Sequence, residues 1–224
     1  MQALLDAIQA NRADEVRRLL EAHPEAAGTR SPAGLSPLTL ATYLARPALV
    51  ELIRAHRGQP DFFEACLLGD EPAVRAHLQR GQDVNAYAPD GFTPLGLAAY
   101  FGHQAVARLL LQQQADVNAC ARNSQQVGPI HAAVSRNDLA MLELLLAHGA
   151  DPDLPQQQLF RPLHVAAANG NAVMIGLLLL HGARSDLRTE SGKLTSELAR
   201  DRGHNFLADR LQTFEGNAPP RSAS

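Results

Sequence analysis

The chain has 224 residues, of which 46% are hydrophobic and 19% are charged. This balance is typical of folded, water-soluble proteins and excludes a disordered chain. The net charge of −3 gives the chain as a whole no electrostatic attraction to nucleic acid or to an anionic membrane. We therefore expect neither class of partner.

The cysteine content and the apolar segments indicate where the protein works. Cys66 and Cys120 are the only cysteines, which is too few for a disulfide framework. Residues 1–11 include Asp6 and do not have a basic start followed by an apolar run, so we expect no secretory signal there. The longest strongly apolar stretch, 177–180, is far too short to span a bilayer. We therefore expect a reducing, cytoplasmic setting.

One pattern recurs along the chain. Pro94, Pro129 and Pro162 begin similar segments, spaced by 35 and then 33 positions. After each proline come a pair of alanines, a short break, a block of leucines and a turn. The alanine pairs are 98–99, 132–133 and 166–167, and the leucine blocks are 109–111, 144–146 and 177–180. A fixed period of this length is the signature of a repeat architecture.

The order of residues in one segment predicts two short helices. Proline suits the first helical position because its φ is fixed near the helical value and it lacks an N–H group. Ser36 and Thr93 precede such prolines and can cap the free N–H groups. Gly102 and Gly170 are placed to end the first helix, and the leucine block forms the apolar stripe of the second. Because one pair cannot bury its own apolar face, neighbouring pairs must stack.

The same phase places further repeats in chain order. Residues 1–27 fit a degenerate opening repeat, 36–41 start the next, and 64–86 form a third with Asp61 in the place of the proline. The three segments described above follow, and 191–204 fit a closing repeat with a charged exterior. We therefore predict one domain over residues 1–214 with about seven repeats, including degenerate N- and C-terminal caps. Residues 215–224 are rich in Pro, Ser and Ala and are predicted to be a flexible tail.

The stretch 90–119, which runs from Asp-Gly-Phe-Thr-Pro-Leu to Ala-Asp-Val-Asn-Ala, resembles an ankyrin repeat almost position by position. The stretch 162–167, Pro-Leu-His-Val-Ala-Ala, carries the same signature, and the resemblance covers roughly residues 1–214. It implies an all-α ankyrin-repeat solenoid of stacked helix-turn-helix units with short hairpin loops. It also implies a protein that binds another protein or peptide on its concave face.

The chain departs from the family pattern in four places. About nine residues are missing after Ile53, so a projecting hairpin should be absent or stunted before Asp61. Two extra residues between Cys120 and Val127 should lengthen another hairpin. Gln114 stands where the family usually has glycine. The family's Thr-Pro-Leu-His is nowhere complete, so the hydrogen bonds of its threonine and histidine should be partly lost.

Nothing in the sequence predicts a catalytic centre, a metal site or a cofactor. Most of the nine histidines fall at repeat positions and none forms an i, i+4 pair with another, so we interpret them as structural. Residues 151–153, Asp-Pro-Asp, lack the glycine and glutamate of a calcium loop. The glutamine runs 112–114, 125–126 and 156–158 are interpreted as solvated turns. We therefore expect the protein not to be an enzyme.

Partner-binding residues are predicted from the positions that end each first helix and from the hairpin positions just before the cap. In the N-terminal half these are apolar, and exposed apolar clusters point to an interface. The predicted residues are Tyr43, Leu44, Leu67, Leu68, Phe92, Tyr100, Phe101, Val127, Arg136, Phe160 and Asn169.

Two alternatives to partner binding remain open from the sequence. The aromatic residues could instead pack into the gap left by the missing hairpin. The same apolar face could also join two copies of the chain, as a self-associating, homodimeric structural protein.

Overall fold

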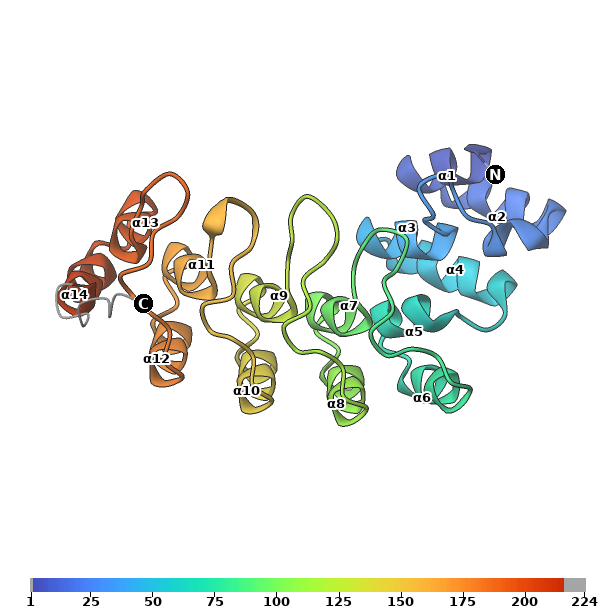
Figure 1. Cartoon of the computed structure of the whole chain (residues 1–224). Coiled ribbons are helices and arrows are strands. Elements are labelled where there is room, and N and C mark those ends of the chain that lie inside the picture. Colours follow the sequence, from blue (N-terminus) through green and yellow to red (C-terminus); the bar gives the residue numbers. More distant parts are fainter. Residues whose placement is uncertain (1, 216–224) are drawn as a thin grey trace. The chain divides into compact units, whose positions relative to one another are not determined.

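The computed structural model of the protein describes residues 2–215. Over these residues it contains fourteen α-helices, two short 3₁₀-helices and no β-strand, which confirms the all-α fold. The helices follow one another as seven pairs, as the spacing predicts (Figure 1). In the described part of the chain, no helix is both long enough and apolar enough to cross a membrane.

The chain divides into two compact units between Ala115 and Asp116. The N-terminal unit holds the pairs α1 (Gln2–Gln9) and α2 (Ala13–Ala22), α3 (Pro37–Tyr43) and α4 (Pro47–Arg57), α5 (Phe62–Leu68) and α6 (Glu71–Gln79), and α7 (Pro94–Phe101) and α8 (Gln104–Gln112), with the 3₁₀-helix η1 (Pro24–Gly28). The C-terminal unit holds α9 (Pro129–Ser135) and α10 (Leu139–Ala147), α11 (Pro162–Ala168) and α12 (Ala172–Leu180), and α13 (Thr195–Asp201) and α14 (Asn205–Glu215), with η2 (Gln157–Leu159). The single domain predicted over 1–214 stays a prediction.

Within each unit the pairs stack as the apolar pattern requires. In the N-terminal unit α3 contacts α1 and α5, and α5 contacts α7. In the C-terminal unit α11 contacts α9 and α13. The alanines of the first helices allow this close approach, since Ala98, Ala133 and Ala167 are fully buried.

Capping residues fix the helix ends of the N-terminal unit. Ser36 accepts a hydrogen bond from the N–H of Thr39, and Thr93 accepts one from the N–H of Gly96, each followed by a proline at the first helical position. Gly102 ends α7 in the left-handed conformation with φ of 79°. The caps predicted at Ser36, Thr93 and Gly102 are therefore confirmed, whereas α11 has Asn169 as its C-cap and Gly170 follows one residue later.

In the C-terminal unit, histidine replaces part of the lost capping. Gly128 and Arg161 make no side-chain cap. Instead Nδ1 of His131 accepts from the N–H of Gly128, and its Nε2 donates to the carbonyl of Leu154. His164 makes the equivalent bonds to Arg161 and to the carbonyl of Leu187. As expected, the hydrogen bonds of the family motif are only partly lost.

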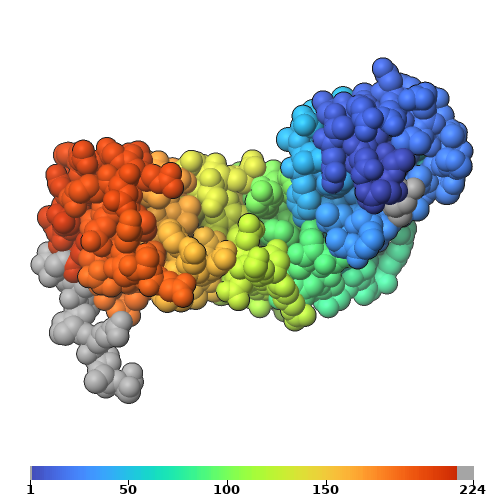
Figure 2. All heavy atoms as spheres, turned by 90° about the horizontal axis from the view of Figure 1, so that it is seen from above, coloured from blue at the N-terminus to red at the C-terminus, as the bar shows by residue number. Residues whose placement is uncertain are grey.

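The hairpin after α4 is absent, as the sequence predicts. Arg57 ends α4 and α5 begins at Phe62. Asp61 is the N-cap of α5, so Phe62, one residue later than predicted, occupies the place of the proline. The prediction was wrong by one position because no proline marks the register there. Without the hairpin, α3 contacts α5 directly. In Figure 2 the atoms of the α3–α4 pair (light blue to cyan) adjoin those of the α5–α6 pair (teal).

Charged side chains stabilise this shortened junction. Glu64 is fully buried, and its carboxylate accepts from the N–H of Asp61 at 2.9 Å and from the guanidinium of Arg57 at 3.0 Å. Asp61 in turn caps the N–H of Glu64 and pairs with Arg30. The junction therefore depends on an ion-pair network where other repeats have a hairpin.

The remaining hairpins follow the sequence prediction. The hairpin closed by Ala121 and Val127 has the longer tip, whereas the one closed by Gln156 and Phe160 is shorter. In the C-terminal unit the tips are joined by backbone bonds, from the N–H of Gln157 to the carbonyl of Gln125 and from the N–H of Glu190 to the carbonyl of Gln158.

Two local expectations have clear outcomes. The turn after α8 forms without glycine, because Gln114 adopts the left-handed φ of 63° itself. Glu215 was predicted to begin the tail, but it is the last residue of α14, where its carboxylate accepts from the N–H and hydroxyl of Ser196. The rest of the predicted tail, 216–224, lies outside the described residues.

Candidate partner-binding surface

Four of the predicted residues form an aromatic cluster in the N-terminal unit. The ring of Tyr43 stacks on that of Phe101, with centroids 5.7 Å apart and planes at 20°. Tyr100 meets Phe101 edge-on at 5.2 Å, and Phe92 lies 6.1 Å from Tyr100. The cluster brings together the end of α3, the end of α7 and the hairpin before α7. Aromatic pairs of this geometry are typical of stable packing as well as of binding surfaces.

Tyr43 closes the space left by the missing hairpin. Its hydroxyl donates to Asp90 in the hairpin before α7. Burial, and then the Asp90 carboxylate, raise the pKa of the Tyr43 phenol. In the same region a Cβ placed on Gly34 would lie 2.2 Å from Pro89, so the two hairpins that flank the gap touch each other. Of the predicted aromatic residues, Tyr43 is therefore the one that packs into the gap left by the missing hairpin, as one of the two alternatives expects.

The N-terminal unit contains an apolar pocket of about 530 Å³. It lies between α4 and the C-terminal ends of α5 and α7. Leu67, Leu68 and Phe101, all predicted as binding residues, line it together with Val50. We refer to this cavity as the N-terminal pocket.

The charge inside the N-terminal pocket is not balanced. Arg46 lines it and makes no ion pair with the described residues, and its Nε is buried without a hydrogen-bond partner among them. Glu51, the acidic residue in the lining, pairs with Arg54 at 3.5 Å. Because no described carboxylate pairs with Arg46, the charge of its guanidinium favours an acidic group of a partner over a basic one.

The other predicted residues of the N-terminal unit differ in exposure. Tyr100 is 46% exposed and Leu44 is 36% exposed, so both are open to a partner. Phe92, Phe101 and Leu68 are half-buried. Leu67 is 1% exposed, so its side chain belongs mainly to the core.

In the C-terminal unit the predicted residues do not form an apolar cluster. Phe160 packs edge-on against His164, with centroids 6.0 Å apart, and Val127 is half-buried at its hairpin. Arg136 is exposed, and Asn169 donates to the carbonyl of Val134. These four residues therefore lie at separate turns and do not contact one another as a cluster.

Sequence reasoning missed Arg46 and Val50. Both residues belong to the second pair of helices, and only the first helix of that pair was considered for partner binding. The sequence does contain a signal for Arg46. It directly precedes Pro47, the first residue of α4, and so places a cation at the N-cap of that helix. Among residues 2–215 no group of His, Cys, Asp or Glu side chains is arranged to hold a metal ion.

Comparison with known families agrees with the repeats seen in the structure. The family profile described as "Ankyrin repeats (3 copies)" matches residues 62–156, and the profile "Ankyrin repeat" matches 160–190. Together they cover more than half of the chain, including α5 to α12. No curated protein matches the sequence. The chain therefore belongs to the ankyrin repeat proteins, whose repeats are generally protein–protein interaction modules and are typically not catalytic.

Proposed function

We propose that the protein binds a partner protein or peptide through its N-terminal unit, using the N-terminal pocket and the exposed residues beside it. The pocket carries the proposal, because it is apolar, large enough for one or two side chains, and contains the unpaired Arg46. Such a pocket suits a segment with a bulky apolar residue next to an acidic one. Each bulky side chain buried there would contribute on the order of 1–3 kcal/mol to association.

The exposed aromatic surface supports the same site. Phe101 lines the pocket and also contacts Tyr100, which is 46% exposed, so the pocket and the aromatic cluster are continuous. The wider prediction, that Val127, Arg136, Phe160 and Asn169 extend one interface along a concave face, rests on the family resemblance. The cytoplasmic setting is likewise part of the proposal.

The proposal is tested by selecting phage-displayed peptides on the full chain. We expect enriched peptides to combine an apolar residue with Asp or Glu. Arg46→Glu and Leu68→Gln should each weaken their binding about tenfold. The matched control is Arg108→Glu, which changes an exposed arginine on α8 in the same unit. Circular dichroism checks that each variant keeps its helices. Equal binding by the pocket variants and the control would refute the site.

Self-association is the competing function for the same surface. It predicts a dimer in sedimentation velocity at micromolar concentration, and Tyr100→Ala should dissociate it. A monomer under these conditions excludes the homodimer and leaves partner binding in place.

A further inference from the structure

Helix α12 differs from the other second helices because it has no polar residue. Where α8 has Arg108 and α10 has Glu143, α12 has Gly176. At the last position of the helix α12 has Leu180, which is 86% exposed. A helix that is apolar all round is normally buried on all sides.

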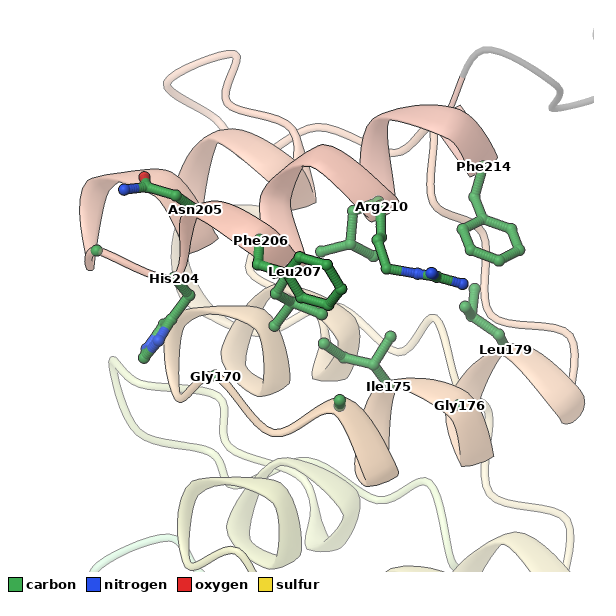
Figure 3. A pocket seen from close by; sticks show the side chains of 13 residues that line it. Gly170, Ile175, Gly176, Leu179, His204, Asn205, Phe206, Leu207, Arg210 and Phe214 are labelled. Atoms are coloured by element: carbon green, nitrogen blue, oxygen red, sulfur yellow. The ribbon is translucent and has the colours of Figure 1, made fainter.

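A cavity of about 650 Å³ lies between α12 and α14, within the C-terminal unit (Figure 3). We name it the C-terminal groove. Ile175, Gly176 and Leu179 line one wall, and Phe206 and Phe214 line the other. Phe206 is 79% exposed and Phe214 is 51% exposed, although both are aromatic.

These exposed side chains are concentrated on two helices. Of the seven large hydrophobic residues that are exposed in the described chain, four belong to α12 and α14: Val173, Leu180, Phe206 and Phe214. Two of them, Phe206 and Phe214, line the C-terminal groove, and exposed apolar side chains gathered in this way mark an interaction site.

One cation lies in the apolar groove. The Arg210 side chain runs along it toward Leu179 and Phe214, with its guanidinium carbon 6.0 Å from the centre of the Phe206 ring (Figure 3). Arg210 has no ion pair among residues 2–215. The nearest acids in sequence are already used, since Asp209 pairs with Arg200 and Glu215 accepts from Ser196.

We propose that the C-terminal groove binds an amphipathic helix of a partner protein, with apolar side chains between α12 and α14 and a carboxylate facing Arg210. A helix fits better than an extended segment. Both walls are helices whose backbone groups are already bonded, so an extended peptide would leave its own N–H and C=O groups unpaired. Gly176 allows close approach, because a Cβ built there would have no atom within 4 Å.

Other occupants lack the matching chemistry. Residues 216–224 contain no Asp or Glu and no Leu, Ile, Val, Met or aromatic residue. In a two-fold contact of the groove with itself, each copy would bring Arg210 and no free carboxylate. The inference does not depend on the N-terminal pocket, which lies in the other unit.

The test uses the full chain to sort a yeast-displayed library of helices that keep leucine along one face and vary the other positions. We expect enriched helices to carry Asp or Glu beside the leucine face. Arg210→Glu should weaken their binding about tenfold, and replacing the acid of the helix by Lys should restore it. Arg202→Glu, an exposed arginine outside the groove lining, is the matched control.

A second variant separates binding from folding. Gly176→Gln places a polar residue at this position, where α8 and α10 also have one, and its side chain extends into the groove. Because Gln favours helix more than Gly does, the melting temperature should stay the same or rise while binding falls about tenfold. Three results would overturn the proposal: equal binding by Arg210→Glu and Arg202→Glu, flotation with anionic vesicles that Gly176→Gln abolishes, or a dimer that Gly176→Gln dissociates.

Discussion

The two units differ in the chemistry that joins some of their neighbouring repeats, although a histidine bond also occurs in the N-terminal unit, between Nε2 of His103 and the carbonyl of Leu67. In the C-terminal unit, neutral groups make the connections: His131 and His164 bond to backbone groups of their own turn and of the following one. At the shortened junction of the N-terminal unit, the connection is a network of ionised groups around the buried Glu64. The difference teaches that a repeat stack tolerates the loss of a hairpin when charged side chains satisfy the exposed backbone. The two kinds of connection should also fail under different conditions.

The largest effect is expected from Glu64→Ala. It removes the nearer carboxylate partner of the mostly buried Arg57, which keeps only Asp61 at 3.6 Å, and it removes the acceptor for the N–H of Asp61. The free energy of unfolding should fall by about 4 kcal/mol, measured by urea denaturation. Hydrogen exchange should show α4 and α5 losing protection before the C-terminal unit.

The matched control is Glu51→Ala, which removes an exposed partner of Arg54. It should cost less than about 1 kcal/mol. If the two substitutions cost the same, the network at the junction does not stabilise the N-terminal unit.

Mild acid should act on the C-terminal unit. Burial lowers the pKa of His131 from its ordinary 6.5 to about 4, and burial lowers the pKa of His164 as well. Well above pH 6.5, His131 is neutral in both the folded and the unfolded chain, so the free energy of unfolding does not change with pH. As the pH falls, the unfolded chain takes up a proton that folded His131 refuses, so stability is lost. Between about pH 7 and about pH 5 the loss from His131 should be about 2 kcal/mol.

This loss is checked by urea denaturation at the two pH values, with hydrogen exchange to locate it in α9 and α11. His181→Gln, which changes an exposed histidine, should leave the pH dependence unaltered. Loss of protection first in α3 to α5 would contradict the comparison between the units.

The smallest effect concerns the turn that ends the N-terminal unit. Gln114 has φ of 63°, whereas the equivalent turn of the C-terminal unit has Gly149 with φ of 85°. Gln114→Gly should stabilise the protein by about 1 kcal/mol, because glycine adopts this conformation without steric cost. Gly149→Ala should destabilise it. Thermal unfolding of both variants tests the pair, and no gain from Gln114→Gly would mean that Gln114 is not strained.

Most of the fold could be predicted because its signals are local. The prolines, Ser36, Thr93 and the glycines mark helix ends within a few residues, and the missing hairpin is visible as a shorter spacing. The register at Asp61 was wrong by one because Phe62 stands in the place of the usual proline and Asp61 is the cap before it.

The site was harder to predict because it depends on contacts between distant residues. The exposed positions Tyr100 and Leu44 follow from helix phase. The bond between Tyr43 and Asp90 requires two hairpins to meet across the gap. The C-terminal groove was missed because 177–180 was interpreted as one more core stripe, and sequence spacing does not reveal which leucines α14 leaves uncovered.

The joined hairpin tips of the C-terminal unit have an evolutionary consequence. Their ties run between backbone groups of Gln125 and Gln157 and of Gln158 and Glu190, so they do not depend on which side chains stand there. Mutation can therefore alter the chemistry displayed by these tips at little cost to folding. A lineage carrying this scaffold could exchange one recognition target for another by surface substitutions alone.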